Sequence, residues 1–267
     1  MSLARNCKKQ EKEKTLNNFE SLDTYLASRR RFIISIWAGT GVGKSYFALT
    51  APKPIYFLSM EPDGPYWALQ TAIESKLIKP DDVLMDEVIR TSLKSSNPPL
   101  VRGLSEDIKI YNHIKNQIEE IISDGEDGGT LVIDTGTSWN QLMQKVEMED
   151  IMKKRKAQGR DAFAFDYRYA NDAMKSSIDA IRNSNLNCVI THHGQPEYNA
   201  KGEALNRMKY SVNNYLQNWV DLQLELRYTK ETKQRYAIFE KCRVNVSKVG
   251  SEVDDPNFNN ILESLGI

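Results

Sequence analysis

The feature that most constrains this chain is a glycine-rich turn between an apolar run and a Lys-Ser pair. Residues 32–45 read Phe-Ile-Ile-Ser-Ile-Trp-Ala-Gly-Thr-Gly-Val-Gly-Lys-Ser. The apolar run at 32–36 suits a buried strand, and residues 44–49 could begin a helix. The three glycines between them let the backbone curl until several N–H groups face one anion, and the helix N-terminus adds its partial positive charge. This order of elements predicts a phosphate-binding loop, or P-loop.

Two residues at the end of the predicted P-loop have defined tasks. Lys44 can reach the β- and γ-phosphates of a nucleotide, and the Ser45 hydroxyl can coordinate Mg²⁺. Ala38 occupies the first position of the pattern, where glycine is usual, and a small residue still fits there. The alternative is a glycine-rich turn without a ligand, which a Gly-Lys-Ser sequence directly after an apolar strand disfavours. The expected nucleotide-binding residues are Gly39, Thr40, Gly41, Val42, Gly43, Lys44, Ser45 and Tyr46.

Two acidic residues follow later apolar runs. Residues 55–60 predict a second buried strand, and Glu61 comes directly after it. A carboxylate there could act as the general base for attack by water, or it could be a solvated acid in a turn. Residues 130–134 form an apolar run that ends in Asp134, which is the Walker B pattern. Asp134 would hold Mg²⁺ through its water shell and so complete the site begun by Ser45.

Composition places few demands on partners. Lys and Arg together number 36, as do Asp and Glu, so contact with nucleic acid would need a local patch of charge. Three cysteines without paired spacing suggest a reduced, intracellular protein, and no apolar run is long enough to cross a membrane. We expect a soluble, cytoplasmic protein of a cell or a phage-infected host, with no membrane partner. Residues 1–15 should be a disordered tail before a single domain at 16–267, which begins with a helix at 16–31.

One segment has the local charge that the chain as a whole lacks. Residues 153–168 contain six basic and two acidic residues, and aromatic residues alternate just after the charges. Basic groups interleaved with aromatic rings could hold the phosphates and stack the bases of single-stranded DNA. The alternative is a solvated helix end followed by core aromatics. The candidate DNA-binding residues are Lys153, Lys154, Arg155, Lys156, Arg160, Phe163 and Phe165.

The second half of the chain predicts a further strand and a hairpin. An apolar run at 187–191 should form a strand that ends at His192-His193. Two adjacent histidines without a third ligand make a poor metal site, so contact with the γ-phosphate is the better functional interpretation; the alternative is a pair facing solvent. Residues 196–216 are interpreted as a long mobile loop, and 219–226 with 234–242 as a hairpin. Helices are expected at 105–124, 137–150 and 170–182, whereas 66–103 predicts no clear structure.

Taken in order, the P-loop, Glu61, Asp134, the Thr191-His192 strand tip and the late Lys241-Cys242-Arg243 resemble the RecA-like branch of P-loop ATPases. More narrowly, the chain resembles phage-encoded, recombinase-like AAA nucleotide-binding proteins of the single-strand annealing type, over about residues 30–245. The resemblance implies an α/β fold. Its RecA-like core would be a mostly parallel central sheet flanked by helices, with a C-terminal antiparallel hairpin.

The resemblance also implies roles for individual residues. Glu61 matches the catalytic glutamate that polarises the attacking water, and Asp134 the aspartate associated with Mg²⁺. His192 stands where these proteins keep a γ-phosphate sensor. Lys241 and Arg243 match a Lys-x-Arg finger that enters a neighbour's nucleotide site, which requires a ring or filament of identical subunits. DNA-binding loops would fall at about 153–168 and 195–215.

Three functions follow as alternatives. The first is an oligomeric, Mg²⁺-dependent ATPase that acts on single-stranded DNA in phage-type recombination or replication. ATP is favoured over GTP because the guanine-specifying Asn-Lys-x-Asp pattern is absent. The second is a P-loop kinase that passes the γ-phosphate to a small acceptor and has no need of Glu61. The third is a nucleotide-gated binding module with little hydrolysis.

Overall fold

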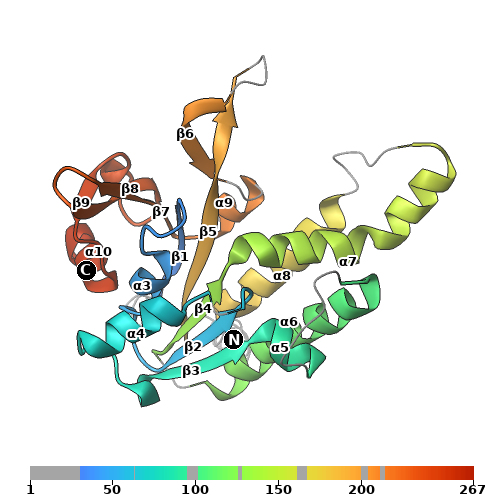
Figure 1. Ribbon diagram of the computed structural model, residues 1–267, viewed down its shortest axis with the longest axis horizontal. Helices are drawn as coiled ribbons and strands as arrows, with labels where there is room; N and C mark the ends of the chain where they lie inside the picture. Colours follow the sequence, from blue (N-terminus) through green and yellow to red (C-terminus); the bar gives the residue numbers. More distant parts are fainter. Residues whose placement is uncertain are drawn as a thin grey trace, which may run out of the picture. The chain divides into compact units, whose positions relative to one another are not determined.

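One mixed β-sheet organises the part of the chain that the computed structural model describes, residues 31–62, 64–94, 102–125, 128–160, 167–199, 204–210 and 214–267 (Figure 1). Residues Phe32–Ile267 form one compact unit. The expected N-terminal tail and helix lie outside the described residues, as do the candidate DNA-binding residues Phe163 and Phe165.

The sheet has the strand order β3-β2-β4-β5-β1-β7-β8-β9, and β6 pairs with β5. From β3 to β7 every neighbouring pair runs parallel, whereas β8 and β9 run antiparallel. This confirms the expected mostly parallel sheet with an antiparallel C-terminal hairpin. The strands are β1 Ile33–Ala38, β2 Ile55–Ser59, β3 Val83–Glu87, β4 Thr130–Asp134, β5 Asn187–Tyr198, β6 Ala204–Tyr210, β7 Leu222–Thr229, β8 Gln234–Cys242 and β9 Glu252–Asp254.

Helices cover both faces of the sheet (Figure 1). Apolar side chains of α5 to α9 pack on one face, and those of α3, α4 and α10 pack on the other. The helices are α3 Lys44–Ala48, α4 Tyr66–Glu74, α5 Val88–Leu93, α6 Leu104–Asp124, α7 Gly136–Ala157, α8 Arg168–Asn183, α9 Asn214–Trp219 and α10 Phe258–Leu265, with short 3₁₀ turns at Pro80–Asp82 and Val246–Lys248.

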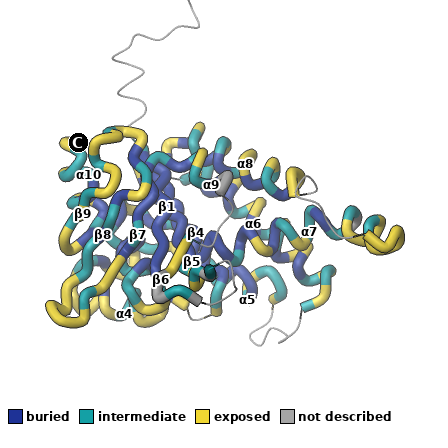
Figure 2. The backbone as a smooth tube through the Cα atoms, turned by 90° about the horizontal axis from the view of Figure 1, so that it is seen from above, coloured by how far each residue is buried: buried dark blue, intermediate teal, exposed yellow. Residues whose placement is uncertain are grey.

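The central strands are apolar along their whole length because both of their faces are buried. In β4, Leu131 and Ile133 pack beneath α6 to α8, whereas Val132 between them packs on the opposite face with α3. The same alternation runs through β5, where Cys188 and Ile190 share the first core and Val189 the second. Figure 2 shows the buried strands at the centre of the molecule.

The prediction of a long loop at 196–216 is wrong. Strand β5 continues to Tyr198 and pairs antiparallel with β6, with Gly194 opposite Tyr210, and α9 follows. The hairpin is held by contacts far away in sequence: the Tyr210 hydroxyl lies 3.0 Å from Ser35 Oγ, and its ring packs edge-on against Trp37. The sequence predicts a loop at 196–216 because the segment is polar and contains glycine. Composition carries no information about the distant residues that Tyr210 contacts, so it could not predict the strand.

Two other segments differ from expectation. Helix α7 was expected to end near residue 150, but it continues to Ala157 and includes the first four basic residues of the candidate DNA segment. The region 66–103, which the sequence left without clear structure, contains α4, β3 and α5. Within the described part of the chain, no helix combines the length and the apolar character needed to cross a bilayer.

Candidate nucleotide-binding site

The sheet register brings the predicted site residues to one edge of the sheet. Ser59 lies beside Asp134 in neighbouring parallel strands, so the loop that follows β2 meets the end of β4. The Met60 amide donates a 2.6 Å hydrogen bond to the Asp134 carbonyl oxygen. Because side chains alternate along a strand, Asp134 projects from the same face as Val132, the face that α3 covers. Asp134 therefore faces the P-loop side of the sheet.

The P-loop connects β1 to α3. Gly41 and Gly43 have φ values of 78° and 107°, which side chains rarely adopt. Lys44 begins α3, and its buried ammonium donates to the Gly39 carbonyl at 3.2 Å and the Ala38 carbonyl at 3.5 Å. Burial lowers the pKa of Lys44, and the charges of Asp134 and Glu61 partly oppose that shift. A desolvated amine enclosed by its own loop suits binding to an anion.

Ser45 and Asp134 offer oxygen ligands beside this loop. Ser45 Oγ donates to Asp134 Oδ2 at 2.8 Å, and Thr191 Oγ1 donates to Asp134 Oδ1. Burial raises the pKa of Asp134, and these two hydrogen bonds counteract the shift. No group of three or more His, Cys, Asp and Glu side chains among the described residues could hold a metal by itself. One hydroxyl and one carboxylate instead fit Mg²⁺, which retains several waters and shares phosphate oxygens.

Glu61 is held in place by His193, for which the sequence predicted no contact with Glu61. Its Oε1 lies 2.7 Å from His193 Nε2, and this hydrogen bond is the main cause of the lowered pKa of Glu61. The His193 backbone amide donates to Thr137 Oγ1 at 3.0 Å, which anchors this part of β5 to the start of α7. Strand alternation was the available signal, because His193 lies two residues beyond Thr191 and so shares its face.

His192 points to the opposite face. Its side chain is fully buried and packs against Tyr210, with ring centroids 5.1 Å apart. Neither ring nitrogen has a hydrogen-bond partner, and burial lowers the pKa of His192 to about 3. In this position His192 does not reach the P-loop face, so the γ-phosphate contact expected for it has no support, and His193 is the histidine that lies in the site.

Lys241 and Arg243 lie at the other end of the sheet from the P-loop. Lys241 of β8 pairs with Gln223 of β7, which in turn pairs with Ser35 of β1. Ser35 lies three residues before Ala38, the end of β1 at which the P-loop starts. Lys241 Nζ donates to the Val220 carbonyl at 3.0 Å and to that of Gln217. Arg243 donates to the Asn218 carbonyl and lies 4.0 Å from Asp221. Neither residue joins the site of its own chain.

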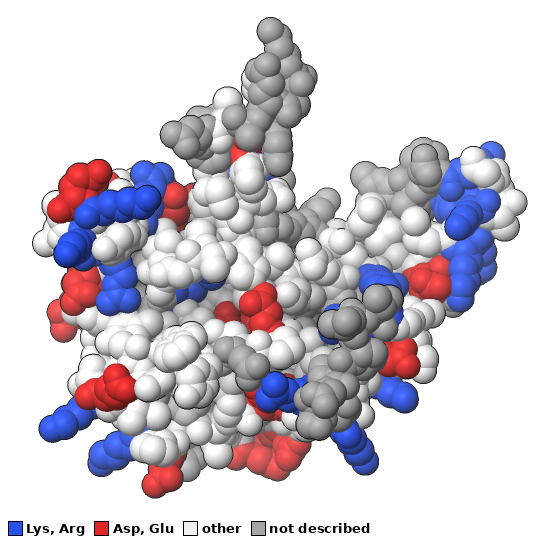
Figure 3. All heavy atoms as spheres, viewed as in Figure 1, with Lys and Arg blue, Asp and Glu red and all other residues white. Residues whose placement is uncertain are grey.

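The basic part of the candidate DNA segment forms the outer end of α7. Lys153, Lys154, Lys156 and Arg160 are exposed, and Lys153 forms a 3.2 Å ion pair with Glu149. Figure 3 shows Lys and Arg side chains gathered at this end of the helix, where it extends past the sheet.

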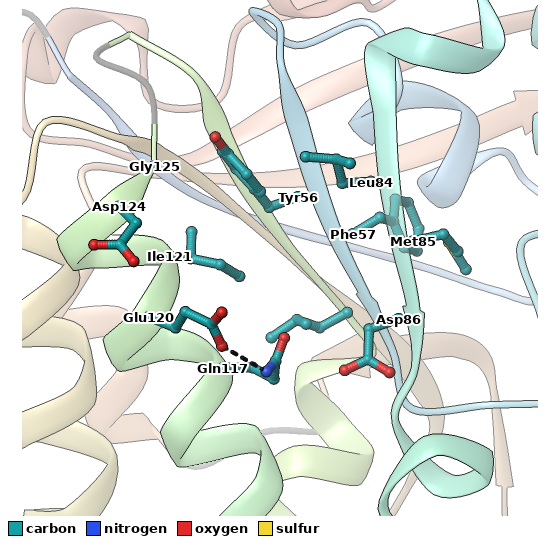
Figure 4. A pocket seen from close by; sticks show the side chains of 11 residues that line it. Tyr56, Phe57, Leu84, Met85, Asp86, Gln117, Glu120, Ile121, Asp124 and Gly125 are labelled. Carbon is teal, nitrogen blue, oxygen red and sulfur yellow. Dashed lines mark hydrogen bonds between the residues drawn. The ribbon is translucent and has the colours of Figure 1, made fainter.

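A separate hollow lies between β2, β3 and α6 (Figure 4). Its volume is about 310 Å³, and it contains none of the predicted site residues. Carboxylates of Asp86, Glu120 and Asp124 surround an apolar floor that includes Ile121. This hollow is therefore not part of the P-loop site.

A glycine-rich loop between a central parallel strand and a helix that begins at Lys44, with the Ser45–Asp134 pair beside it, is the arrangement of a P-loop nucleotide-binding domain. The model of the AAA_24 family, described as an AAA domain, matches residues 30–249, and the chain belongs to this family. The fold is also similar to the crystal structure of the RadB recombinase, with a TM-score of 0.47 and 13% identity over 88% of this chain and 92% of that chain. A search of curated proteins found no match.

Proposed function

We propose that this protein binds and hydrolyses ATP with Mg²⁺ at the P-loop site. The observation that carries the proposal is the Glu61–His193 hydrogen bond of 2.7 Å at the same sheet edge as the Ser45–Asp134 pair. A carboxylate held in its charged form next to a phosphate-binding loop can accept a proton from an attacking water. This favours hydrolysis over phosphoryl transfer to a small acceptor, for which Glu61 would not be needed.

Each group in the site has one task in this proposal. The loop amides and Lys44 bind the phosphates, and Ser45 and Asp134 hold Mg²⁺. When bound, Mg²⁺ would neutralise charge on the phosphate oxygens. Glu61 orients and deprotonates water, and His193 fixes the direction of its carboxylate. Thr191 fixes the Asp134 carboxylate from the opposite side to Ser45.

The active form in this proposal is a ring or filament. Lys241 and Arg243 lie far along the sheet from their own P-loop, so a contribution to phosphoryl transfer would have to go to a neighbouring subunit. Both side chains now hydrogen-bond to carbonyls at the end of α9, and assembly would exchange those bonds for contacts with the neighbour's nucleotide. Arginine fingers of this kind act on the charge that develops during transfer.

Single-stranded DNA is the proposed partner. The exposed basic end of α7 offers sequence-independent contacts to phosphates. Strand β5 passes from His193, in the nucleotide site, directly into the β5–β6 hairpin. This hairpin falls within 195–215, the second predicted DNA-binding segment, so β5 would link the state of the nucleotide to DNA contact there.

The test is steady-state phosphate release with ATP and Mg²⁺, with and without single-stranded DNA, over a range of protein concentrations. Turnover should rise with DNA and steeply with protein. Glu61→Gln should reduce turnover by at least about 100-fold, in the range of general-base losses, and leave ATP affinity nearly unchanged. Glu74→Gln, on the exposed side of α4, is the matched control and should behave as wild type.

Each part of the proposal can fail separately. Phosphate release that is the same in Glu61→Gln and wild type would contradict the general-base role. Turnover that is indifferent to DNA and to protein concentration would contradict the assembly on DNA. ATP binding without measurable release would favour the nucleotide-gated module.

A further inference from the structure

Arg235, at the start of β8, lies directly against the P-loop of its own chain. A Cβ atom built on Gly43 would lie 2.8 Å from Arg235 Nη1, so the guanidinium occupies the space beside that glycine. The Arg235 guanidinium carbon lies 4.9 Å from the centroid of the Tyr46 ring, within the range of a cation–π contact. One cationic side chain thus contacts two residues of the phosphate-binding segment.

The sheet register explains why a residue nearly two hundred positions away reaches the loop. Trp37, next to the last residue of β1, lies beside Glu225 of β7, and β7 continues for several residues beyond that level. Tyr228 on this extension lies opposite Arg235. Arg235 and Ala237 are two residues apart in β8, so their side chains project from the same face of the sheet. Ala237 packs with α3, and Arg235 therefore projects from the face that α3 covers. Figure 1 shows β7 and β8 beside β1 and α3.

Among the residues that the structure describes, Arg235 forms one weak ion pair. Its ion-pair partner, Asp255, lies 3.8 Å away and is 84% exposed, so solvent screens the pair. The Arg235 side chain itself is 32% exposed, so part of it is open to solvent beside the loop. Guanidinium groups donate paired hydrogen bonds to phosphate oxygens in a fixed planar geometry.

We infer that Arg235 is a nucleotide-binding residue that acts in its own subunit, on the α- and β-phosphates. This rests on the proposed nucleotide binding at the P-loop. In a P-loop the backbone amides enclose the α- and β-phosphates, whereas the lysine reaches the β- and γ-phosphates. Arg235 contacts the loop at Gly43 and Tyr46 and so belongs to the first group. It differs in both position and task from Lys241 and Arg243, which lie at the opposite end of the sheet.

The assignment makes a specific prediction about nucleotide affinity. ADP and ATP share the α- and β-phosphates, so loss of the Arg235 charge should weaken both to the same degree. A charge-assisted hydrogen bond corresponds to about 10- to 100-fold in affinity. We would measure ADP and ATP binding by titration calorimetry with Mg²⁺ for wild type and Arg235→Gln. ATP titrations would be done in the Glu61→Gln background to prevent turnover.

Arg227→Gln is the matched control. Arg227 lies on the partner strand of the same hairpin and donates to Glu225 at 2.8 Å, and its affinity change should stay within about twofold, as for a surface position. Arg235→Met serves as a second variant because it keeps an unbranched stem against Tyr46 without the charge. It should lose the same affinity as Arg235→Gln, and unliganded melting temperatures of both would show that the variants are folded.

Three results would overturn the inference. Unchanged affinity in both folded Arg235 variants would mean that the residue does not bind nucleotide. A loss for ATP alone would move Arg235 to the γ-phosphate. An equal loss in Arg227→Gln would point to a general effect of the hairpin. If wild type itself binds neither nucleotide while Lys44→Ala behaves identically, it is the proposed function that fails.

Discussion

His192 should make the folded protein sensitive to mild acid. The ring is fully buried, and both of its nitrogens lack hydrogen-bond partners. Burial therefore favours the neutral ring, and the nearby charges of His193 and Lys44 act in the same direction. The result is a pKa of about 3 in the folded state, against an ordinary value of 6.5.

The sign and size of the effect follow from proton linkage. Above pH 6.5 the ring is neutral in both states and contributes no pH dependence. Below 6.5 the unfolded chain binds a proton that the folded protein does not, so the free energy of unfolding falls as the pH falls toward 3. Each pH unit corresponds to about 1.4 kcal/mol, so His192 should remove about 2 kcal/mol at pH 5.

The assay is urea unfolding of wild type and His192→Leu at pH 7.5 and pH 5.0, without nucleotide. Leucine is apolar and cannot titrate, and any change in packing that does not depend on pH cancels between the two conditions. Wild type should lose about 2 kcal/mol more than His192→Leu on acidification. A control, His113→Gln, leaves the buried His192 ring in place and should keep the acid loss.

An equal acid loss in wild type and His192→Leu would refute this reasoning. It would mean that the buried ring either reaches water or accepts a proton without cost. The carboxylates that also titrate in this range are shared by the two proteins, so they cannot hide the difference.

Three further predictions concern other positions. Gly136→Ala should lower the free energy of unfolding by about 1–3 kcal/mol, because the new Cβ would lie 2.4 Å from His192 Cε1; wild-type stability would contradict this packing. Asp221→Ala should cost a similar 1–3 kcal/mol or so in urea unfolding, because it leaves the Ile33 amide, now bonded at 2.9 Å, without its acceptor. Arg243→Ala should abolish DNA-stimulated phosphate release and spare ATP affinity, and equal turnover in this variant would reject the finger.

The local part of the site could be predicted from the sequence. A strand, a glycine loop and a Lys-Ser helix start are contiguous, and their chemistry depends on residues within 14 positions of each other. Asp134 was predicted for a related reason, since an apolar strand followed by an acid is also a short pattern. The parallel character of the sheet was implied by the resemblance to RecA-like P-loop ATPases, and central strands that are buried on both faces agree with it.

The face of the sheet to which a residue belongs can also be predicted from a short segment. His192 and His193 are adjacent, and alternation along β5 sends them to opposite faces. One lies beside Glu61 and the other is buried beneath Tyr210. Composition alone treats the two histidines as equivalent.

Register and long-range packing were decided by the tertiary structure. Whether residues 204–210 form a strand depends on Tyr210 meeting Ser35 and Trp37, and the place of Arg235 beside Gly43 depends on how far β7 continues past β1. The sequence by itself determined which short segments carry the residues that we propose for phosphate and cation binding, because that chemistry is set by neighbouring residues. Strand pairing decides which distant side chains lie beside these segments. The energy of pairing is the sum of many contacts between segments, so no single segment of the sequence contains it.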